Sequence, residues 1–296
     1  MDFLKGTGVA IITPFKKNGE IDFNAYKLLI DFYINNGINY LVILGTTGES
    51  HCISFEEKDK ILKSVVEFNK GRLPLIVGFG NNDTQKLVNE LSNFELENFS
   101  AVLSVCPYYN KPSQVGLYEH FFHVSKASPI PLILYDVPSR TGVSISNETI
   151  FKLLEKCDNI IGIKDATGDI KKGIDLIKNT PKSFNVISGD DFTALELVLN
   201  GGSGVISVAA GAFPREFSKI ITLAKNRKKQ EAKVQFKRME NIINLLFKNG
   251  NPSGIKALIS IRGFCENILR LPLTPVDKGL YEDIKESINI FDKNIL

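Results

Sequence analysis

The sequence has few of the residues that build redox frameworks or metal centres. Its 296 residues contain only four cysteines and three histidines. The cysteines are far apart and show no CxxC spacing, so we expect free thiols in a reducing cytosol rather than disulfides or a zinc site. The histidines form no HExxH motif. His120 and His123 lie three residues apart on an expected helix, which leaves a metal pair open, although a packed or solvated role is favoured.

Long apolar runs and blocks of one charge are also missing. The longest apolar stretches have the length of a strand, so no membrane span is expected. The N-terminus lacks the apolar region of a signal peptide. The net charge is only +3, and lysines and acidic residues are interspersed, so nothing indicates a nucleic-acid partner. We therefore expect a cytoplasmic protein whose partners are small molecules.

Eight short, β-rich apolar runs recur along the chain, most of them about 30 residues apart. Continuous runs of this kind are typical of parallel strands that are covered on both faces. The expected strands are Gly8–Thr13, Tyr40–Gly45, Leu73–Gly78, Ala101–Cys106, Pro131–Tyr135, Ile160–Lys164, Phe184–Ser188 and Gly204–Val208. Amphipathic stretches lie between them, for example at Phe23–Asn36, Ser54–Asn69, Thr84–Glu97, Gly116–Ala127, Ser146–Lys156, Ile170–Asn179 and Asp191–Asn200.

This alternation predicts an α/β protein built as a (β/α)₈ barrel over residues 1–225. The remaining residues, 226–296, predict a C-terminal helical extension packed on the barrel, with helices near Lys229–Asn249, Ile255–Gly263 and Lys278–Asp292. A doubly wound open sheet is the alternative architecture. The count of eight strands favours the barrel, and Gly78-Phe-Gly80 lacks the third glycine of a dinucleotide-binding fingerprint.

Lys164 ends an otherwise apolar strand, which makes it the first candidate for catalysis. A charged amine is costly there, because a low-dielectric environment disfavours the ammonium form, and a free amine can form an imine with a ketone. The plain alternative is a lysine that caps the strand and extends into water. In a barrel, the carboxyl ends of all strands meet at one face, so widely separated residues converge with Lys164. These are Thr46, Thr47, Tyr108, Tyr109, Tyr135, Arg140, Gly189 and Ile206.

These residue types suit imine chemistry on a keto acid. Tyrosine and threonine hydroxyls both donate and accept protons, so they can relay them. Thr46, Thr47 and nearby loop amides can also receive a carboxylate, and Arg140 can hold a second carboxylate bidentately. Taken singly, each has an ordinary alternative. Gly45-Thr-Thr-Gly-Glu-Ser50 could be a turn with a helix cap, Tyr108 an aromatic plug, and Arg140 a solvated side chain.

Seven motifs in the right order resemble the dihydrodipicolinate synthase family, within the pyruvate-dependent class I lyase/aldolase superfamily. They span essentially the whole chain. They are Gly45-Thr-Thr-Gly-Glu-Ser50, Pro107-Tyr-Tyr-Asn-Lys-Pro112, Leu134-Tyr-Asp-Val-Pro-Ser-Arg-Thr-Gly142, Gly162-Ile-Lys-Asp-Ala-Thr-Gly168, Ser188-Gly-Asp-Asp191, Gly204-Val-Ile-Ser207 and Arg270-Leu-Pro-Leu-Thr-Pro275.

The resemblance implies a role for each site residue. Lys164 would form a Schiff base with pyruvate, and Tyr135, Thr46 and Tyr109 would relay protons, with Tyr109 reaching into a neighbouring subunit's site. Thr47 would hold the pyruvyl carboxylate, Arg140 would receive the carboxylate of L-aspartate-4-semialdehyde, and Gly189 and Ile206 would line the site. The family implies a homo-oligomer, usually a dimer of dimers, in the diaminopimelate and lysine pathway, with no metal or organic cofactor.

Related superfamily members stay open as alternatives, namely N-acetylneuraminate lyase and 2-keto-3-deoxy sugar acid aldolases. They share the lysine and the strand-five tyrosine, but they generally lack an arginine like Arg140. A catalytically silent barrel that serves as a binding protein would have lost the lysine or the tyrosine, and both are present. One departure from the family is Asp136, where asparagine is common. We expect it to leave the site working, although an extra carboxylate could alter substrate affinity.

Family members that are inhibited by lysine bind it at a dimer interface, and Ser50, Asn82 and Tyr108 match that pocket. Phe55, Lys58 and Lys86 stand where sensitive members carry histidines and a glutamate. Two lysines would repel the ammonium groups of a lysine ligand. Weak or absent feedback by lysine is therefore expected.

Overall fold

The computed structural model describes residues 2–293 and forms a closed barrel of eight parallel strands. Each strand pairs with the next in sequence, and β8 pairs with β1. The strands are β1 Gly6–Ala10, β2 Tyr40–Ile43, β3 Leu75–Phe79, β4 Ala101–Val105, β5 Leu132–Asp136, β6 Ile160–Asp165, β7 Asn185–Ser188 and β8 Gly204–Ser207. The predicted (β/α)₈ fold is therefore confirmed.

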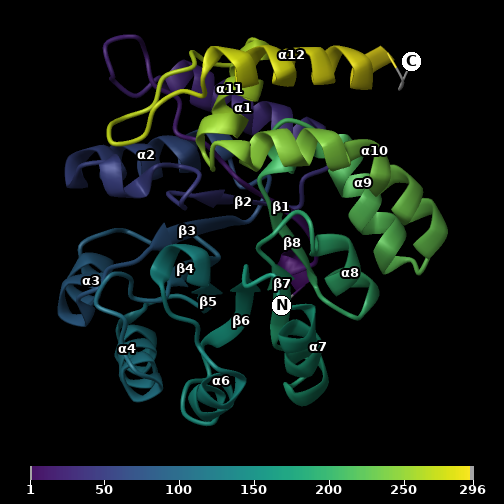
Figure 1. Cartoon of the computed structure of the whole chain (residues 1–296). Helices are drawn as coiled ribbons and strands as arrows, with labels where there is room; N and C mark the ends of the chain where they lie inside the picture. The colour runs from purple at the N-terminus through teal and green to yellow at the C-terminus, as the bar shows by residue number, and fades with distance from the viewer. Residues whose placement is uncertain (1, 294–296) are drawn as a thin grey trace.

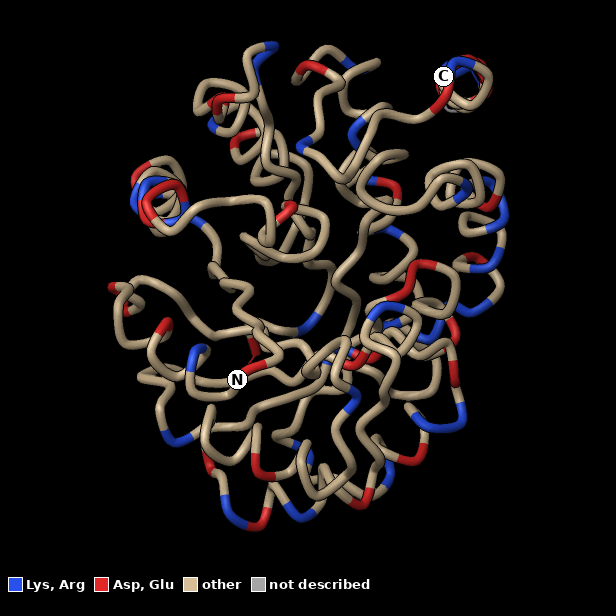
Figure 2. The backbone as a smooth tube through the Cα atoms, turned by 60° about the vertical axis from the view of Figure 1, so that its left-hand side comes forward, with Lys and Arg blue, Asp and Glu red and all other residues tan. Residues whose placement is uncertain are grey.

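Helices cover the outside of the barrel (Figure 1). Those that follow the strands are α1 Phe23–Asn35, α2 Phe55–Asn69, α3 Thr84–Ser92, α4 Gln114–Ala127, α5 Pro138–Thr141, α6 Asn147–Leu154, α7 Ile170–Asn179, α8 Ala194–Leu199 and α9 Pro214–Lys225. Short polar residues cap many of them. Ser54, for example, forms a capping box with Glu57 at the start of α2. Over the outer helices, basic and acidic residues alternate without a large region of one sign (Figure 2).

Three further helices follow the barrel: α10 Lys229–Lys248, α11 Ser253–Ile261 and α12 Lys278–Lys293. They lie together along one side of the molecule in Figure 1, and α10 packs against both α9 and α12. The end of α9 at Lys225 coincides with the predicted boundary at 225/226. The division of the chain into two parts at that point stays a prediction. Among residues 2–293, no helix combines the length and apolar character that a membrane crossing requires.

Several elements differ from the predicted ranges by a few residues, and two of the differences have a clear structural reason. The first strand begins at Gly6, before the apolar run, because Gly6 lies against β8 where the two backbones approach closely. A Cβ atom on Gly204 would stand 1.9 Å from the Gly6 carbonyl oxygen. The third helix was expected to reach Glu97 but ends at Ser92. The residues after it, Phe94, Leu96 and Phe99, are buried without helical geometry, so a segment of irregular backbone also contributes to the core.

Side chains divide into two buried clusters on the two faces of the strands. The inner cluster fills the barrel and includes Tyr135, Ile187 and Ile206, whereas Leu134 and Ile163 belong to the outer cluster beneath the helices. Because successive strand residues point to opposite faces, this alternation decides which side chains enter the barrel. Tyr135 points inward, and its neighbour Asp136 faces the helix layer.

Candidate active site

Lys164 lies inside the barrel next to Tyr135. The two residues are register partners on β5 and β6, and the Lys164 Nζ atom stands 4.3 Å from the centre of the Tyr135 ring. The lysine is only 6% exposed, and no salt bridge to it is found among residues 2–293. An amine that is held against an aromatic ring, without a carboxylate partner, is placed to react with an electrophile that enters the barrel mouth.

Gly189 and Ile206 both lie near this lysine's end of the barrel. Gly189 follows β7, and a Cβ atom at that position would stand 2.9 Å from Cγ and from Cε of Lys164. Only a glycine therefore leaves room for the lysine stem there. Ile206 belongs to β8 and shares the inner cluster with Tyr135. The structure thus brings Lys164, Tyr135, Gly189 and Ile206 to one end of the barrel, as predicted.

Thr46 and Thr47 sit in a tight turn after β2. The Gly48 amide donates to the Gly45 carbonyl at 3.0 Å, and the Glu49 amide donates to Thr46 at 3.1 Å. Thr47 is buried, and its hydroxyl accepts a hydrogen bond of 3.0 Å from Asn251 Nδ2, whereas Thr46 is half-buried. Among the described residues no hydrogen bond joins Thr46 to Tyr135 or to Tyr109, so this chain alone does not assemble the predicted relay.

Arg140 and Thr47 are connected through one residue. The Arg140 Nη2 atom donates to the backbone carbonyl of Asn251 at 2.9 Å, and the same asparagine bonds to Thr47. Arg140 lies in the short helix α5 and is exposed, so the rest of its guanidinium can reach a ligand. Arg140 and Thr47, which were predicted to hold two different carboxylates, are therefore both hydrogen-bonded to Asn251.

Tyr108 and Tyr109 point in different directions. Tyr108 is half-buried, and the centre of its ring lies 5.2 Å from that of His51 in an edge-to-face arrangement. Tyr109 has a positive φ of 74° and is 87% exposed. A backbone in this region is unusual for a bulky residue, so the loop holds Tyr109 in a strained conformation with its side chain exposed.

Comparison with known proteins gives the family. The model of the dihydrodipicolinate synthetase family matches residues 3–290. The chain belongs to this family. A curated relative, the 4-hydroxy-tetrahydrodipicolinate synthase of Flavobacterium psychrophilum, is 47% identical over 98% of this chain and 98% of its own length. The dihydrodipicolinate synthase of Aquifex aeolicus has a solved structure with a TM-score of 0.94 and 38% identity, covering 97% of this chain and 98% of that one.

A third similar protein carries one of the expected substrates. The chloride-inhibited dihydrodipicolinate synthase of Acinetobacter baumannii, solved in complex with pyruvate, has a TM-score of 0.93 and 39% identity, covering 98% of this chain and 99% of that one. Because curated relatives across nearly the whole chain share one name, the predicted family, its lyase class and its 4-hydroxy-tetrahydrodipicolinate synthase activity are confirmed.

The structure also shows residues that support the candidate site and that the sequence did not single out. Asn251, which contacts Thr47 and Arg140, is one. Asp191 is another: its buried carboxylate accepts hydrogen bonds from the amides of Val208 at 3.1 Å and Ala209 at 2.7 Å, which ties the end of β7 to the segment after β8. Burial raises the pKa of Asp191 to about 6. Asp191 falls inside the Ser188-Gly-Asp-Asp191 motif, so its position was visible, but its partners are backbone groups that no side-chain pattern reveals.

The histidine pair does not form a metal site. His120 is buried and its Nδ1 atom lies 2.9 Å from the Thr84 hydroxyl, whereas His123 is exposed and lies 3.8 Å from Glu119. Within residues 2–293, no group of three or more histidine, cysteine, aspartate or glutamate side chains could hold a metal ion. The favoured interpretation, one packed and one solvated histidine, is confirmed for these two residues.

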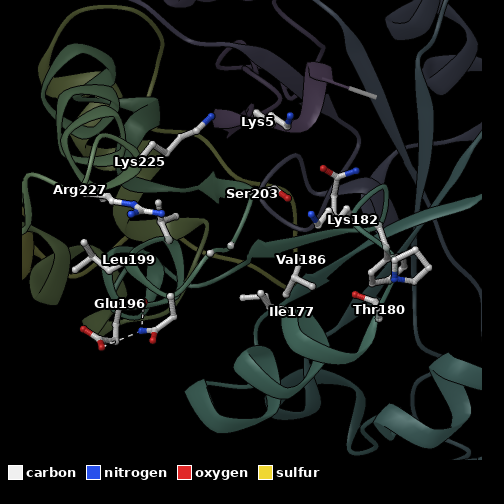
Figure 3. A pocket seen from close by; sticks show the side chains of 18 of the residues that line it. Lys5, Ile177, Thr180, Lys182, Val186, Glu196, Leu199, Ser203, Lys225 and Arg227 are labelled. Carbon is white, nitrogen blue, oxygen red and sulfur yellow. Dashed lines mark hydrogen bonds between the residues drawn. The ribbon is translucent and has the colours of Figure 1, made fainter.

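A cavity lies at the opposite end of the barrel, where β1, β7 and β8 begin. It has a volume of about 920 Å³, and Lys5, Lys182, Lys225 and Arg227 stand around it (Figure 3). These cations are all exposed, and Lys5 is already paired with Asp2 at 2.5 Å. In (β/α)₈ enzymes the chemistry occurs at the carboxyl ends of the strands, so this cavity is separate from Lys164.

Proposed function

We propose that this chain makes 4-hydroxy-tetrahydrodipicolinate by condensing pyruvate with L-aspartate-4-semialdehyde through an imine on Lys164, in the diaminopimelate and lysine pathway. The observation that carries the proposal is the buried Lys164 amine, 4.3 Å from the Tyr135 ring centre and packed against Gly189. The pyruvate complex of the Acinetobacter baumannii relative supports pyruvate as the first substrate.

The reaction begins at the Lys164 amine. Its nitrogen attacks the keto carbon of pyruvate, and the resulting carbinolamine loses water to give the imine. Loss of a methyl proton then gives an enamine, whose carbon attacks the aldehyde of the second substrate. The amino group of that substrate next attacks the imine carbon, closes the ring and releases Lys164. The imine nitrogen accepts an electron pair when the methyl proton leaves, and it returns that pair when the enamine carbon attacks the aldehyde, so we propose that no metal or organic cofactor takes part.

Protons must reach and leave these intermediates, and we assign this task to hydroxyl groups. Tyr135 is next to the amine, and Thr46 lies in the turn after β2. The third hydroxyl is proposed to be that of Tyr109 of the partner subunit, because Tyr109 is 87% exposed within its own chain and is free to contact a second copy. The enzyme is therefore proposed to work as a homo-oligomer, with a dimer as the catalytic unit and a dimer of dimers as the assembly.

The two carboxylates need separate positive or hydrogen-bonding groups. Thr47, with the amides of its turn, is proposed to hold the pyruvyl carboxylate, while Gly189 and Ile206 line the site. Arg140 is proposed to hold the carboxylate of the semialdehyde, because its guanidinium is exposed on the side that does not contact Asn251.

The four cysteines are free thiols in the structure, a state that fits a reducing cytoplasm.

Borohydride trapping tests the proposal. The purified enzyme is incubated with pyruvate and sodium borohydride, digested, and mapped by mass spectrometry. We expect a reduced pyruvyl adduct on the peptide that contains Lys164 and none in Lys164→Ala. An adduct on a different peptide, or none with pyruvate, contradicts the mechanism. Assays with L-aspartate-4-semialdehyde, N-acetylneuraminate and 2-keto-3-deoxygluconate identify the second substrate.

Mixing two inactive variants tests the shared site. Lys164→Ala keeps Tyr109, and Tyr109→Ala keeps Lys164, so each variant alone should lose most of its activity. After the two are unfolded and refolded together, random dimers should restore about a quarter of the active sites, because half the dimers are mixed and each has one complete site. If the mixture stays inactive, Tyr109 does not act across subunits.

A further inference from the structure

A buried ion pair lies directly behind the residues of the proposed imine chemistry. Asp136 ends β5 and is 0% exposed, and its Oδ2 atom accepts hydrogen bonds from Lys172 Nζ at 2.5 Å and Ser144 Oγ at 2.6 Å. Lys172 belongs to the first turn of α7 and also donates to the Ile145 carbonyl at 2.6 Å. Lys172 Nζ also donates to Ser144 Oγ at 3.0 Å, so three oxygens fix one ammonium group at a single position.

Backbone pairing connects this ion pair to Lys164. Tyr135 is in register with Lys164, and Asp136 is in register with Asp165, the next residue on each strand. The Ala166 amide donates to the Asp136 carbonyl at 2.8 Å, which joins the two strand ends. Tyr135 and Lys164 face the barrel interior while Asp136 faces the helices, so the carboxylate and the amine lie on opposite faces of the barrel wall, on adjacent strands.

The titratable groups at these strand ends are mostly acidic. β5, β6 and the segment after β7 contribute Asp136, Asp165, Asp190 and Asp191, and α7 contributes the cation Lys172. The charges act on one another. Burial raises the pKa of Asp165, hydrogen bonds from Thr167 oppose that shift, Lys172 lowers the pKa and Asp136 raises it. Of these four acidic groups, only Asp136 forms a salt bridge within residues 2–293.

We propose that Lys172 is a positioning residue for the reaction at Lys164, in that its cation compensates the buried Asp136 carboxylate beside the reactive strand. The inference rests on the proposed imine at Lys164. An uncompensated carboxylate close to Lys164 favours its ammonium form, and an ammonium group has no electron pair with which to attack pyruvate. The Lys172 cation compensates the negative charge of Asp136. It also holds Asp136, and with it the adjacent Tyr135, in place.

This explains how Asp136 is accommodated. An asparagine at this position needs no counter-ion, because a neutral amide can accept the Ser144 hydrogen bond by itself. An aspartate does need one, and Lys172 provides it at 2.5 Å. The two residues are therefore expected to depend on each other. The Asp136 carboxylate without Lys172 should slow the reaction at Lys164, whereas the Asp136–Lys172 pair should not.

Four variants test the proposal by the rate of borohydride labelling with pyruvate at neutral pH. They are Lys172→Met, Asp136→Asn, the double variant of both, and Lys171→Met as the matched control. Lys171 is the neighbouring residue in the same helix turn, but it is exposed. We expect Lys172→Met to slow labelling about fivefold or more, since the field of the carboxylate then acts unopposed. The other three are expected to stay within about twofold of the unmodified enzyme, because none leaves Asp136 charged and unpaired.

A second readout separates charge from packing. The defect of Lys172→Met should diminish as the pH rises, because a higher pH restores the free amine of Lys164. A purely structural role for Lys172 predicts instead that Lys172→Met and the double variant are equally slow at every pH, and that result overturns the proposal. Labelling of Lys172→Met at the unmodified rate also overturns it.

Two further outcomes are distinguishable. If Lys172→Met does not fold, the comparison between Asp136→Asn and the double variant decides, since Lys172 should be dispensable once Asp136 is neutral. A double variant that labels at least about fivefold more slowly than Asp136→Asn rejects the charge role. Failure of the unmodified enzyme to label at Lys164 rejects the proposed function itself, before any variant is compared.

Discussion

The side-chain amide of Asn251 donates a 3.0 Å hydrogen bond to the hydroxyl of Thr47. The two residues are 204 positions apart in the sequence, and Asn251 comes from the loop between α10 and α11. The backbone carbonyl of the same residue accepts from Arg140. The C-terminal extension is therefore part of the proposed active site, because it contacts both proposed carboxylate-binding residues.

Replacement of Asn251 by alanine should weaken the binding of pyruvate. Without its amide, the Thr47 hydroxyl loses the donor that fixes its lone pairs, so one proposed carboxylate contact becomes misoriented. We expect the KM for pyruvate to rise about tenfold, which corresponds to one hydrogen bond of about 1.4 kcal/mol. Asn249→Ala is the control, because Asn249 is exposed and its side chain bonds to Asp277, away from Thr47 and Arg140. Steady-state kinetics check both, and equal KM values for the two variants would contradict the role of Asn251.

Replacement of Arg140 by alanine should affect the second substrate only. The guanidinium is proposed to bind the semialdehyde carboxylate, and a charge-assisted, bidentate contact contributes more than a neutral hydrogen bond. We expect the KM for L-aspartate-4-semialdehyde to rise at least about tenfold, and pyruvate labelling at Lys164 to stay within about twofold of the unmodified rate. A loss of pyruvate labelling as large as the loss of turnover would place Arg140 at the first step instead.

The barrel and most of its catalytic end could be predicted because both depend on local patterns. Parallel strands that are buried on both faces appear as continuous apolar runs, and each run ends where its functional residue begins. The strand pattern therefore predicts that Lys164 and Tyr135 lie together, and their register on β5 and β6 confirms this prediction. The start of β1 at Gly6 could not be predicted, because Gly6 and Thr7 have no apolar side chain and so do not extend the apolar run.

The supporting contacts could not be predicted, because they depend on which polar side chain turns inward. Lys171 and Lys172 are adjacent and chemically identical, but only Lys172 faces Asp136, and the rotation of α7 on the barrel decides this. The Asn251 contact also depends on how a distant loop folds back over the barrel mouth. Helical periodicity gives the apolar face of a helix, but it does not give the partners of the polar residues at that face's edge.

A second buried ion pair, Glu49–Lys256, should stabilise the turn that carries Thr46 and Thr47. Both side chains are 0% exposed, Lys256 also donates to the Thr13 carbonyl at 2.9 Å, and Glu49 accepts from the Arg270 amide at 2.9 Å. Lys256→Met leaves a buried carboxylate without a cation, so we expect the free energy of unfolding to fall by about 3–5 kcal/mol. Urea denaturation measures this change.

The double variant Glu49→Gln with Lys256→Met should recover part of that loss, since neither charge remains. Lys248→Met is the surface control, because its ion pair with Asp283 at 3.7 Å is exposed and should contribute less than about 1 kcal/mol. If the double variant is no more stable than Lys256→Met, the loss comes from packing rather than from an unpaired charge.

Feedback inhibition by lysine should be weak or absent. At one of the positions that match the family's lysine pocket, Lys58 is half-buried and its Nζ atom lies 2.5 Å from Glu90, so this neighbouring carboxylate is already paired. Phe55 packs its ring 4.7 Å from that of Phe94 and offers no hydrogen-bonding group. A lysine ligand would therefore bring its ammonium groups next to the Lys58 cation, and Glu90 is not free to pair with them. Turnover measured against increasing L-lysine checks this, and inhibition at submillimolar lysine would refute it.

The stability of the fold in acid should depend on His120. Burial lowers the pKa of this histidine to about 4, whereas in the unfolded chain it is about 6.5. As the pH falls from 6.5 to 4, the unfolded state takes up a proton that the folded state does not, so this group's contribution lowers stability across that window. Asp191 acts in the opposite direction, because a carboxyl whose pKa is raised to about 6 loses stability as the pH rises from about 4 to 6.

Because the two effects oppose each other, a variant is needed to isolate that of His120. His120→Leu should give a free energy of unfolding that falls less steeply between pH 6.5 and 4 than that of the unmodified enzyme. His123→Leu is the matched control, since His123 is three residues away on the same helix but exposed, and its curve should follow the unmodified one. Urea denaturation at several pH values measures all three curves. If the His120→Leu curve keeps the unmodified slope, the buried imidazole takes up its proton in the folded state as readily as in the unfolded chain, and burial is not what governs its charge.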